Sequence, residues 1–383
     1  MQTQCVIGLG YGDEGKGATT ATLVERAERP LVVRFSGGHQ AGHTVVAADG
    51  RRHVFSNFGA GTLAGAPTYW SRYCTFYPVG YANERAALLG LVADPLLFVD
   101  GLCPVTTPYD LLYNRERETE VRHGSCGLGF GATVARHQGP HKLHVMDLYD
   151  DFVLEQKLSS VVAYYRNMGA TFASERLDEE LEAFRSAVEV VRGSVRCTCG
   201  PALFDGIEDL YDVLIFEGSQ GLLLDQEFGY FPHVTRAYTS SRNAVALCCE
   251  YGLPLPEIHY VTRCYQTRHG NGPLTNEELE PPQLRATPEE TNVYNPWQGE
   301  QRRSLLDVDQ LRYALDCDAH YSHGCVHRLV VTCLDQLTGQ WRATEGGKAI
   351  DLTTAADLAR RLGLYEVASD SEAPRALRAC GSC

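Results

Sequence analysis

The stretch Cys5-Val6-Ile7-Gly8-Leu9-Gly10-Tyr11-Gly12-Asp13-Glu14-Gly15-Lys16 decides the fold of this chain. Its first five residues form a short apolar run, which is typical of a buried parallel strand. The glycines that follow and Lys16 have the spacing G-x-x-x-x-G-K of a phosphate-binding loop. Residues 16–27 have a helical pattern, and residues 31–35 form a second apolar run. We therefore predict a strand–loop–helix–strand unit whose helix N-terminus binds phosphate, because free backbone N–H groups and the helix dipole favour anions there.

Further along the chain, apolar runs predict more buried strands at residues 96–99, 213–216 and 329–332. Residues 151–195 have apolar positions at helical spacing, and residues 269–304 are rich in Pro, Asn, Gln and Gly, which is typical of long functional loops. We predict an α/β fold formed by a single large domain over residues 1–383. It has a mostly parallel central sheet, a P-loop-like phosphate site, and helical and loop insertions.

Composition excludes several classes of protein. The 383 residues are 44% hydrophobic and 21% charged, as in ordinary globular proteins. A net charge of −14 argues against a general nucleic-acid binder, and no run approaches the roughly 18 apolar residues that span a bilayer. Residues 1–5 run directly into a strand, so we expect no secretory signal and a cytoplasmic protein, in the host cytoplasm if the source is viral. The fourteen cysteines are expected to be mostly buried reduced thiols, not metal ligands.

Two features of the glycine-rich segments suggest chemistry. Gly17 follows Lys16 where a standard P-loop has a Ser or Thr hydroxyl for magnesium, so Asp13 inside the loop is the candidate metal ligand. The second segment, Gly-Gly-His-Gln-Ala-Gly-His-Thr at residues 37–44, follows the second predicted strand. Its histidines favour acid or electrophilic chemistry beside a phosphate, although composition alone equally allows a turn with structural histidines.

Taken together, the two glycine segments resemble the adenylosuccinate synthetase family. The resemblance continues in family order over nearly the whole chain. The further blocks are Gly-Ser-Cys-Gly-Leu-Gly-Phe-Gly (124–131), Phe-Glu-Gly-Ser-Gln-Gly (216–221) with Val-Thr (234–235), Thr-Arg-His-Gly-Asn-Gly-Pro (267–273), and Thr-Cys-Leu-Asp (332–335).

This resemblance implies a ligase that couples L-aspartate to C6 of a 6-oxopurine nucleotide through a 6-phosphoryl intermediate, with a nucleoside triphosphate as co-substrate. Asp13 would be the base and a Mg²⁺ ligand together with the Gly42 carbonyl. His43 would stabilise the 6-oxygen, Lys16 would bind phosphate, and Gln220 would position the purine. The implied nucleotide- or phosphate-binding residues are Gly12, Gly15, Gly17, Gln40, Gly42, Thr44, Ser125, Cys126, Arg136, Thr235, Asp335 and Ser369. Gln298, Gly299, Arg302 and Arg303 would bind aspartate.

The family resemblance also implies a homodimer with small-molecule substrates and neither a nucleic-acid nor a membrane partner. Arg136 would correspond to an arginine that such dimers donate across the interface.

Two departures from the family pattern bear on the substrates, one in the recognition of the donor base and one in the arginine-rich loop. Cys333 replaces the guanine-reading lysine, and the C-terminal base-cradling element is represented only by residues 369–374, so ATP or dATP becomes plausible beside GTP. Gly-Glu-Gln-Arg-Arg at residues 299–303 stands where Gly followed by four arginines is expected. These changes resemble the phage 2-aminoadenylosuccinate synthetases, which accept dGMP, and dGMP is slightly favoured over IMP. Asp13 argues for IMP, because phage members often have a smaller residue there.

Other classes remain as alternatives. A P-loop kinase or GTPase would need a hydroxyl residue after Lys16, which is absent. A non-catalytic nucleotide sensor on the same fold would be expected to lose Asp13, Lys16, His43 or Gln220, and all four are present. Cys126 lies in a glycine loop, but its expected role is a small side chain near phosphate. His269 receives no role from the sequence.

Overall fold

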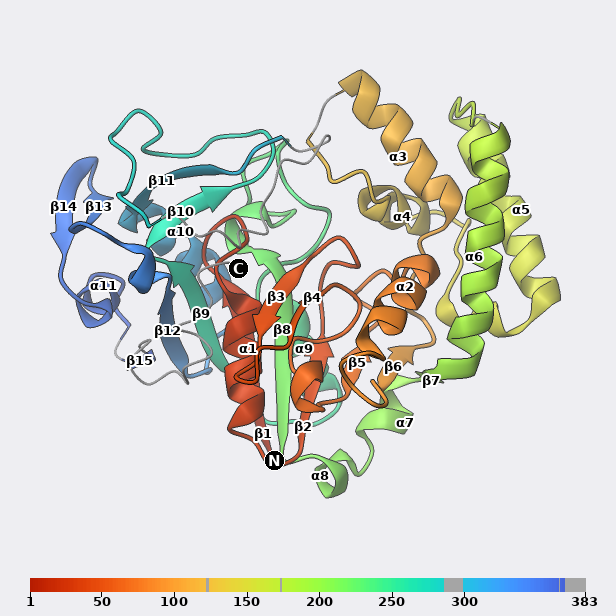
Figure 1. Cartoon of the computed structure of the whole chain (residues 1–383), viewed down its shortest axis with the longest axis horizontal. Helices are drawn as coiled ribbons and strands as arrows, with labels where there is room; N and C mark the ends of the chain where they lie inside the picture. Colours follow the sequence, from red (N-terminus) through yellow and green to blue (C-terminus); the bar gives the residue numbers. More distant parts are fainter. Residues whose placement is uncertain (122–123, 173, 286–298, 365, 369–383) are drawn as a thin grey trace.

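Nine parallel strands form the central sheet of the computed structural model, which describes residues 1–121, 124–172, 174–285, 299–364 and 366–368 (Figure 1). From one edge to the other the strands are β15 (Glu366–Ala368), β12 (His327–Thr332), β9 (Glu257–Arg263), β1 (Gln2–Gly8), β8 (Val213–Gly221), β2 (Pro30–Arg34), β5 (Thr68–Trp70), β6 (Leu97–Asp100) and β7 (Val195–Thr198). Every strand pair in this sheet is parallel. The predicted α/β fold with a mostly parallel sheet is therefore confirmed.

Two smaller sheets accompany the central one. The first has the order β10 (Tyr265–Arg268), β11 (Arg302–Asp307), β13 (Trp341–Glu345) and β14 (Lys348–Leu352). The second is a hairpin of β3 (His43–Val46) and β4 (Arg52–Phe55). Both begin within or beside segments that the sequence predicts to be functional loops, so they hold those loops against the main sheet.

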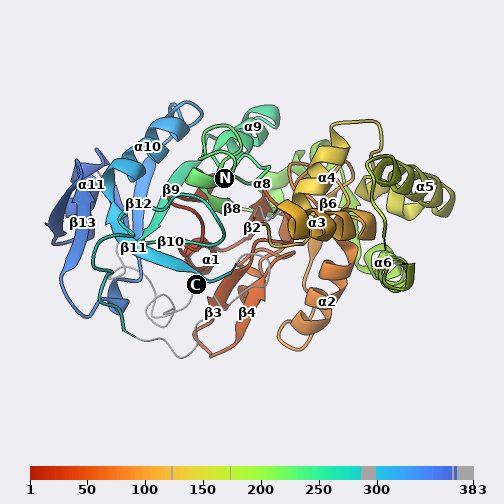
Figure 2. The same cartoon turned by 90° about the horizontal axis from the view of Figure 1, so that it is seen from above.

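Helices gather at both ends of the sheet, as the two views show (Figures 1 and 2). One end carries α2 (Pro78–Leu88), α3 (Pro108–Val121), α4 (Phe130–His137), α5 (Asp151–Asn167) and α6 (Ser174–Ser194), and the other carries α11 (Ala355–Arg361). The remaining α-helices of the described residues are α1 (Lys16–Glu25), α7 (Gly200–Phe204), α8 (Ile207–Leu210), α9 (Arg242–Glu250) and α10 (Val308–Ala319). Within the described ranges, no helix is long and apolar enough to cross a membrane.

The predicted elements correspond closely to the observed ones. The five predicted strands are β1, β2, β6, β8 and β12, and the predicted first helix is α1. The helical region 151–195 is two helices, α5 and α6. Short or polar strands such as β5, β7 and β10 have no clear apolar run, so the sequence does not predict them.

The centre of the sheet positions the glycine loop. Strand β1 lies between β8 and β9, and the side chains of Cys5, Val6 and Ile7 are fully buried. The chain leaves β1 at Gly8 and enters α1 at Lys16, so the loop lies at the carboxyl ends of the central strands. In open parallel sheets this edge is where ligands bind.

Candidate active site

The first glycine loop has a backbone that requires left-handed residues. Gly12, Asp13 and Gly15 have φ values of 106°, 61° and 96°, and aspartate is among the few non-glycine residues that adopt this region readily. Inside the loop, the Glu14 carboxylate accepts hydrogen bonds from the Gly10 and Gly12 amides at 3.1 and 2.7 Å. It also holds Lys16 Nζ at 2.6 Å. The loop is therefore held in shape from within.

The glycine after Lys16 is explained by the approach of the second loop. A Cβ atom at Gly17 would lie 2.7 Å from His43 Cβ, closer than real Cβ contacts allow. Strand β3, which begins at His43, thus lies directly against the start of α1. A Ser or Thr of the standard P-loop would not fit here, and this close contact brings His43 beside the phosphate loop.

His43 is held by a buried carboxylate. Its Nδ1 lies 2.6 Å from Glu217 Oε1 on β8, and its Nε2 lies 3.4 Å from the Ser219 carbonyl oxygen. Glu217 is fully buried and accepts a hydrogen bond from the Ala60 amide, and Arg34 Nη1 lies 3.9 Å away. Burial opposes the ionisation of Glu217, but His43 and Arg34 hold the pKa of its carboxyl below the usual value.

Opposing effects act on the protonation of His43. Burial, together with Arg34 and Lys16, lowers the pKa of His43 below its ordinary value, and the Glu217 carboxylate offsets this only in part. Both ring nitrogens face oxygen acceptors, and only an imidazolium can donate from both at once. Glu217 is thus the neighbour that favours the proton-donating form of His43, against the effect of burial.

Asp13 is surrounded by cationic and polar groups from distant segments. His269 Nε2 lies 2.9 Å from Asp13 Oδ2, and the Gln301 amide donates to the same oxygen at 3.2 Å. Arg263 donates to the Asp13 carbonyl oxygen. Burial raises the pKa of the Asp13 carboxyl, but His269, Arg263 and Lys16 more than offset this and lower it to about 2. Asp13 is therefore an ionised acceptor at neutral pH.

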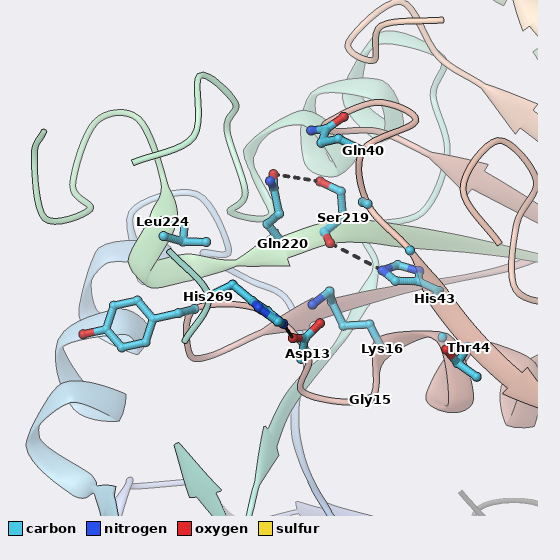
Figure 3. Close-up of a pocket in the computed structure, with 15 residues that line it drawn as sticks. Asp13, Gly15, Lys16, Gln40, His43, Thr44, Ser219, Gln220, Leu224 and His269 are labelled. Carbon is cyan, nitrogen blue, oxygen red and sulfur yellow. Dashed lines mark hydrogen bonds and ion pairs between the residues drawn. The ribbon is translucent and has the colours of Figure 1, made fainter. Parts of the chain in front are cut away.

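Asp13, His43 and His269 line one pocket, shown in Figure 3. Its wall combines both glycine loops with the end of β8 and the turn after β10. The lining residues are Tyr11, Gly12, Asp13, Gly15, Lys16, Gly17, Gln40, Ala41, Gly42, His43, Thr44, Ser219, Gln220, Leu224 and His269. The structure thus brings together all four residues for which the sequence predicts catalytic roles, and six of those predicted to bind nucleotide or phosphate.

Oxygen atoms on this wall fit a magnesium ion. The Asp13 carboxylate and the Gly42 backbone carbonyl belong to residues of the same pocket, and Mg²⁺ prefers such hard oxygen ligands. Among the described residues, no group of three or more His, Cys, Asp or Glu side chains forms a dedicated metal cage. A site with few protein ligands suits Mg²⁺, which usually completes its shell with phosphate oxygens and water.

Ser125, Cys126 and Thr235, which the resemblance also assigns to phosphate binding, lie outside the pocket wall. Ser125 exchanges hydrogen bonds with Asn114 on α3, and the Thr235 amide donates to the carbonyl of Leu224, a pocket residue. Burial raises the pKa of Cys126 to about 11, so its thiol stays protonated and is a poor nucleophile. The loop at 124–131 touches the turn after β10, because a Cβ at Gly124 would lie 3.0 Å from the Asn271 amide nitrogen.

The role predicted for Arg136 is wrong. Its side chain is fully buried, and it donates to both carboxylate oxygens of Asp110, at 2.8 and 2.9 Å. It also donates to the carbonyl oxygens of Val105 and His141. A guanidinium with its donors satisfied inside its own chain is not available to a nucleotide or to a partner subunit, so Arg136 is a structural residue.

The predicted aspartate-binding residues are only partly described. Gln298 and Ser369 lie outside the described residues. Gly299, the first described residue after the range 286–298, is half-buried. Arg302 donates to Glu277 and to the carbonyl oxygens of Gly270 and Gly272, so it braces the turn after β10. The exposed Arg303 donates to Gln301 at 3.3 Å.

The resemblance expects residues 332–335 to contact the base of the donor nucleoside triphosphate. In this segment Cys333 is buried and has a φ of 61°, and Asp335 is exposed.

Three residues of this site, Glu217, His269 and Gln301, have no role predicted from the sequence. Glu217 belongs to the block Phe-Glu-Gly-Ser-Gln-Gly (216–221), but the resemblance assigns it no function, and its importance depends on its contact with His43. His269 occupies the unspecified position of the Thr-Arg-x-Gly-x-Gly-Pro block, and Gln301 replaces an expected arginine. Of the three, only His269 had a local signal, because it is a polar residue directly after strand β10 and inside a glycine-rich turn.

Comparisons with known proteins agree with this geometry. A family model described as adenylosuccinate synthetase matches residues 5–342. An adenylosuccinate synthetase of Marinomonas sp. is 31% identical over 287 residues, which cover 71% of this chain and 64% of that protein. One of Koribacter versatilis is 30% identical over 323 residues, which cover 82% of this chain and 72% of that protein. The match to the Marinomonas protein thus spans less than two thirds of its length.

Two solved structures share the fold. The fully ligated adenylosuccinate synthetase of Plasmodium falciparum has a TM-score of 0.72 at 20% identity, covering 95% of this chain and 86% of that one. The succinoaminodeoxyadenylate synthetase of cyanophage S-2L, bound to dGMP and dATP, has a TM-score of 0.60 at 16% identity, covering 94% and 98%.

Proposed function

Because the chain belongs to the adenylosuccinate synthetase family, we propose that it joins L-aspartate to C6 of a 6-oxopurine nucleotide and converts a nucleoside triphosphate to the diphosphate and phosphate. One observation carries this proposal: Asp13, Lys16, His43 and Gln220 line a single pocket. The four side chains come from two glycine loops and the end of β8, and together they offer a carboxylate base, a lysine ammonium group, an imidazole and an amide.

In the first step, Asp13 accepts the proton from N1 of the purine ring, and the 6-oxygen attacks the γ-phosphorus while the bond to the diphosphate breaks. His43 donates to the 6-oxygen, and Lys16 offsets the charge of the phosphates. Gln220 holds the purine edge. The protein acts here mainly by positioning and by electrostatic stabilisation, as is general for phosphoryl transfer.

In the second step, the amine of L-aspartate attacks C6, the C6–O bond breaks, and inorganic phosphate leaves as the amine loses a proton. Asp13 and Gly42 would hold Mg²⁺, whose charge would help neutralise the phosphate oxygens. Arg303, which is exposed near the start of β11, would bind an aspartate carboxylate.

For the purine we propose dGMP as the slightly favoured substrate, with ATP or dATP as the donor. Cys333 supports the adenine donor, because a buried thiol stands where the family has a guanine-reading lysine. The cyanophage S-2L synthetase, whose structure is bound to dGMP and dATP, has the same fold. Asp13 supports the alternative, an IMP-dependent adenylosuccinate synthetase, since phage members often carry a smaller residue there. A homodimer remains a prediction, to be checked by light scattering.

The test is phosphate release with L-aspartate and Mg²⁺, crossing ATP, dATP and GTP with IMP, GMP and dGMP, with product masses determined. Turnover of dGMP with an adenine triphosphate supports the favoured substrates, and turnover of IMP alone establishes the alternative. Absence of turnover in every combination contradicts the ligase proposal and favours a nucleotide sensor. Asp13→Ala should abolish turnover with the fold intact, and surviving activity would contradict the mechanism.

A further inference from the structure

Two side chains without an assigned role converge on one oxygen of Asp13. His269 Nε2 lies 2.9 Å from Asp13 Oδ2, and the Gln301 side-chain amide donates to the same oxygen at 3.2 Å (Figure 3 shows the His269 contact). Asp13 is 256 residues from His269 and 288 from Gln301 along the chain. Their meeting at a single atom is therefore produced by the tertiary structure alone.

Strand register explains why these two residues reach the same place. Strands β10 and β11 are antiparallel, and Arg268 is paired with Arg302. His269 is the next residue after Arg268, and Gln301 is the residue before Arg302. They therefore extend the ladder by one position and stand opposite each other, at the end of the sheet that meets the glycine loop.

This end of the small sheet is held rigidly. Arg268 is buried, donates to the carbonyl oxygens of Asn271, Pro273 and His233, and lies 4.3 Å from the ring centroid of Tyr11 in the glycine loop. Arg302 donates to the carbonyl oxygens of Gly270 and Gly272 from the opposite strand. The turn that carries His269 is thus fastened both to β11 and to the loop that carries Asp13.

We propose that His269 and Gln301 are positioning residues that together fix the orientation of the Asp13 carboxylate. Two donors on Oδ2 restrict rotation about the Cα–Cβ and Cβ–Cγ bonds and leave Oδ1 to accept the ring proton of the purine. Hydrogen bonds to an ionised acceptor are the strong ones, so a pair of them can hold one rotamer. This inference rests on the proposed role of Asp13 as the base.

The proposal also connects an unspecified position of a family block with a departure from the family pattern. The sequence block leaves position 269 unspecified, and Gln301 stands where an arginine is expected. An amide provides a weaker donor to a carboxylate than a guanidinium does, because it carries no charge. A histidine on the facing strand supplies a second donor to the same oxygen, so the two positions act as a unit.

The test compares donor and non-donor side chains at each position. His269→Val removes a donor, His269→Gln retains an N–H group, Gln301→Leu removes the second donor, and His323→Val on the exposed surface is the control. We measure kcat, the KM values of both substrates and the Kd of the purine nucleotide by calorimetry.

His269→Val should lower kcat by roughly 10- to 100-fold, the order expected for a displaced reacting group, with little change in nucleotide Kd. His269→Gln should recover most of that loss, and the double variant should lose more than the product of the two single losses. The proposal is overturned if His269→Val keeps its kcat, or if His269→Gln is as impaired as His269→Val. A change confined to KM would likewise contradict it.

Crystal structures of the wild type and of the double variant test the positioning of Asp13 without any assumption about the reaction. One carboxylate orientation in the wild type and a rotated or split Asp13 in the double variant support positioning, whatever the substrate is. The same orientation in both refutes it. Failure of the wild type to turn over any purine nucleotide would instead contradict the proposed function.

Discussion

Replacing Gly17 with alanine tests the packing that brings His43 to the phosphate loop. The added Cβ would lie 2.7 Å from His43 Cβ and 3.4 Å from His43 Cα. Restoring ordinary contact requires a shift of about 0.7 Å between the start of α1 and the start of β3. A shift of this size would stretch the 2.6 Å contact between His43 and Glu217.

The expected loss of stability is modest because two effects oppose each other. Alanine gains about 1 kcal/mol of helix propensity over glycine, whereas overpacking a tight site costs about 1–3 kcal/mol. Gly17→Ala should therefore lower the free energy of unfolding by up to about 2 kcal/mol. Gly193→Ala in α6 is the matched control, since a Cβ there meets nothing within 4 Å and only the propensity gain remains.

The effect on activity should exceed the effect on stability. A catalytic group displaced by close to 1 Å typically costs about 100-fold, so kcat of Gly17→Ala should fall roughly 10- to 100-fold. Urea unfolding and phosphate release measure the two quantities. If Gly17→Ala matches Gly193→Ala in stability and retains the wild-type kcat, then the close contact with His43 does not explain the missing P-loop hydroxyl residue.

Three further predictions follow from the same contacts. Arg136→Met should lower the free energy of unfolding by about 3–5 kcal/mol, because it leaves the buried carboxylate of Asp110 unpaired. Arg185→Met, which removes an exposed ion pair, should lower it by less than about 1 kcal/mol, and urea titrations of both variants measure the difference. Burial, with the charges of Arg136 and His144, lowers the pKa of His137 to about 3. Between pH 6.5 and pH 3, therefore, the His137 imidazole is protonated in the unfolded chain but not in the folded one. Stability should therefore fall as pH drops from 6.5 toward 3, by up to about 1.4 kcal/mol per pH unit for this group, and His137→Gln should flatten that slope. Chelation with EDTA should abolish phosphate release and Mg²⁺ should restore it; activity that persists in EDTA would contradict a magnesium site at Asp13.

The local pattern of the sequence determined the elements that have a strong signal. An apolar run followed by glycines and Lys16 specifies a buried strand, a phosphate loop and a helix, because each residue type there is required by burial or by backbone conformation. The family resemblance, and not the local pattern, predicts that Asp13, His43 and Gln220 belong to one site. The strand order of the folded chain explains their meeting, because β1, β8 and β2 are neighbours and the segments after them lie at one edge of the sheet.

Only the tertiary structure decided which partners these residues have. Arg136 stands in a helix beside a phosphate-binding block, yet its position against Asp110 makes it a core residue. Glu217 and His269 act through contacts with residues more than 170 positions away. Such contacts depend on strand order, on the register of β10 with β11 and on how closely two loops pack. These are properties of the whole folded chain, so no local pattern of residues contains them.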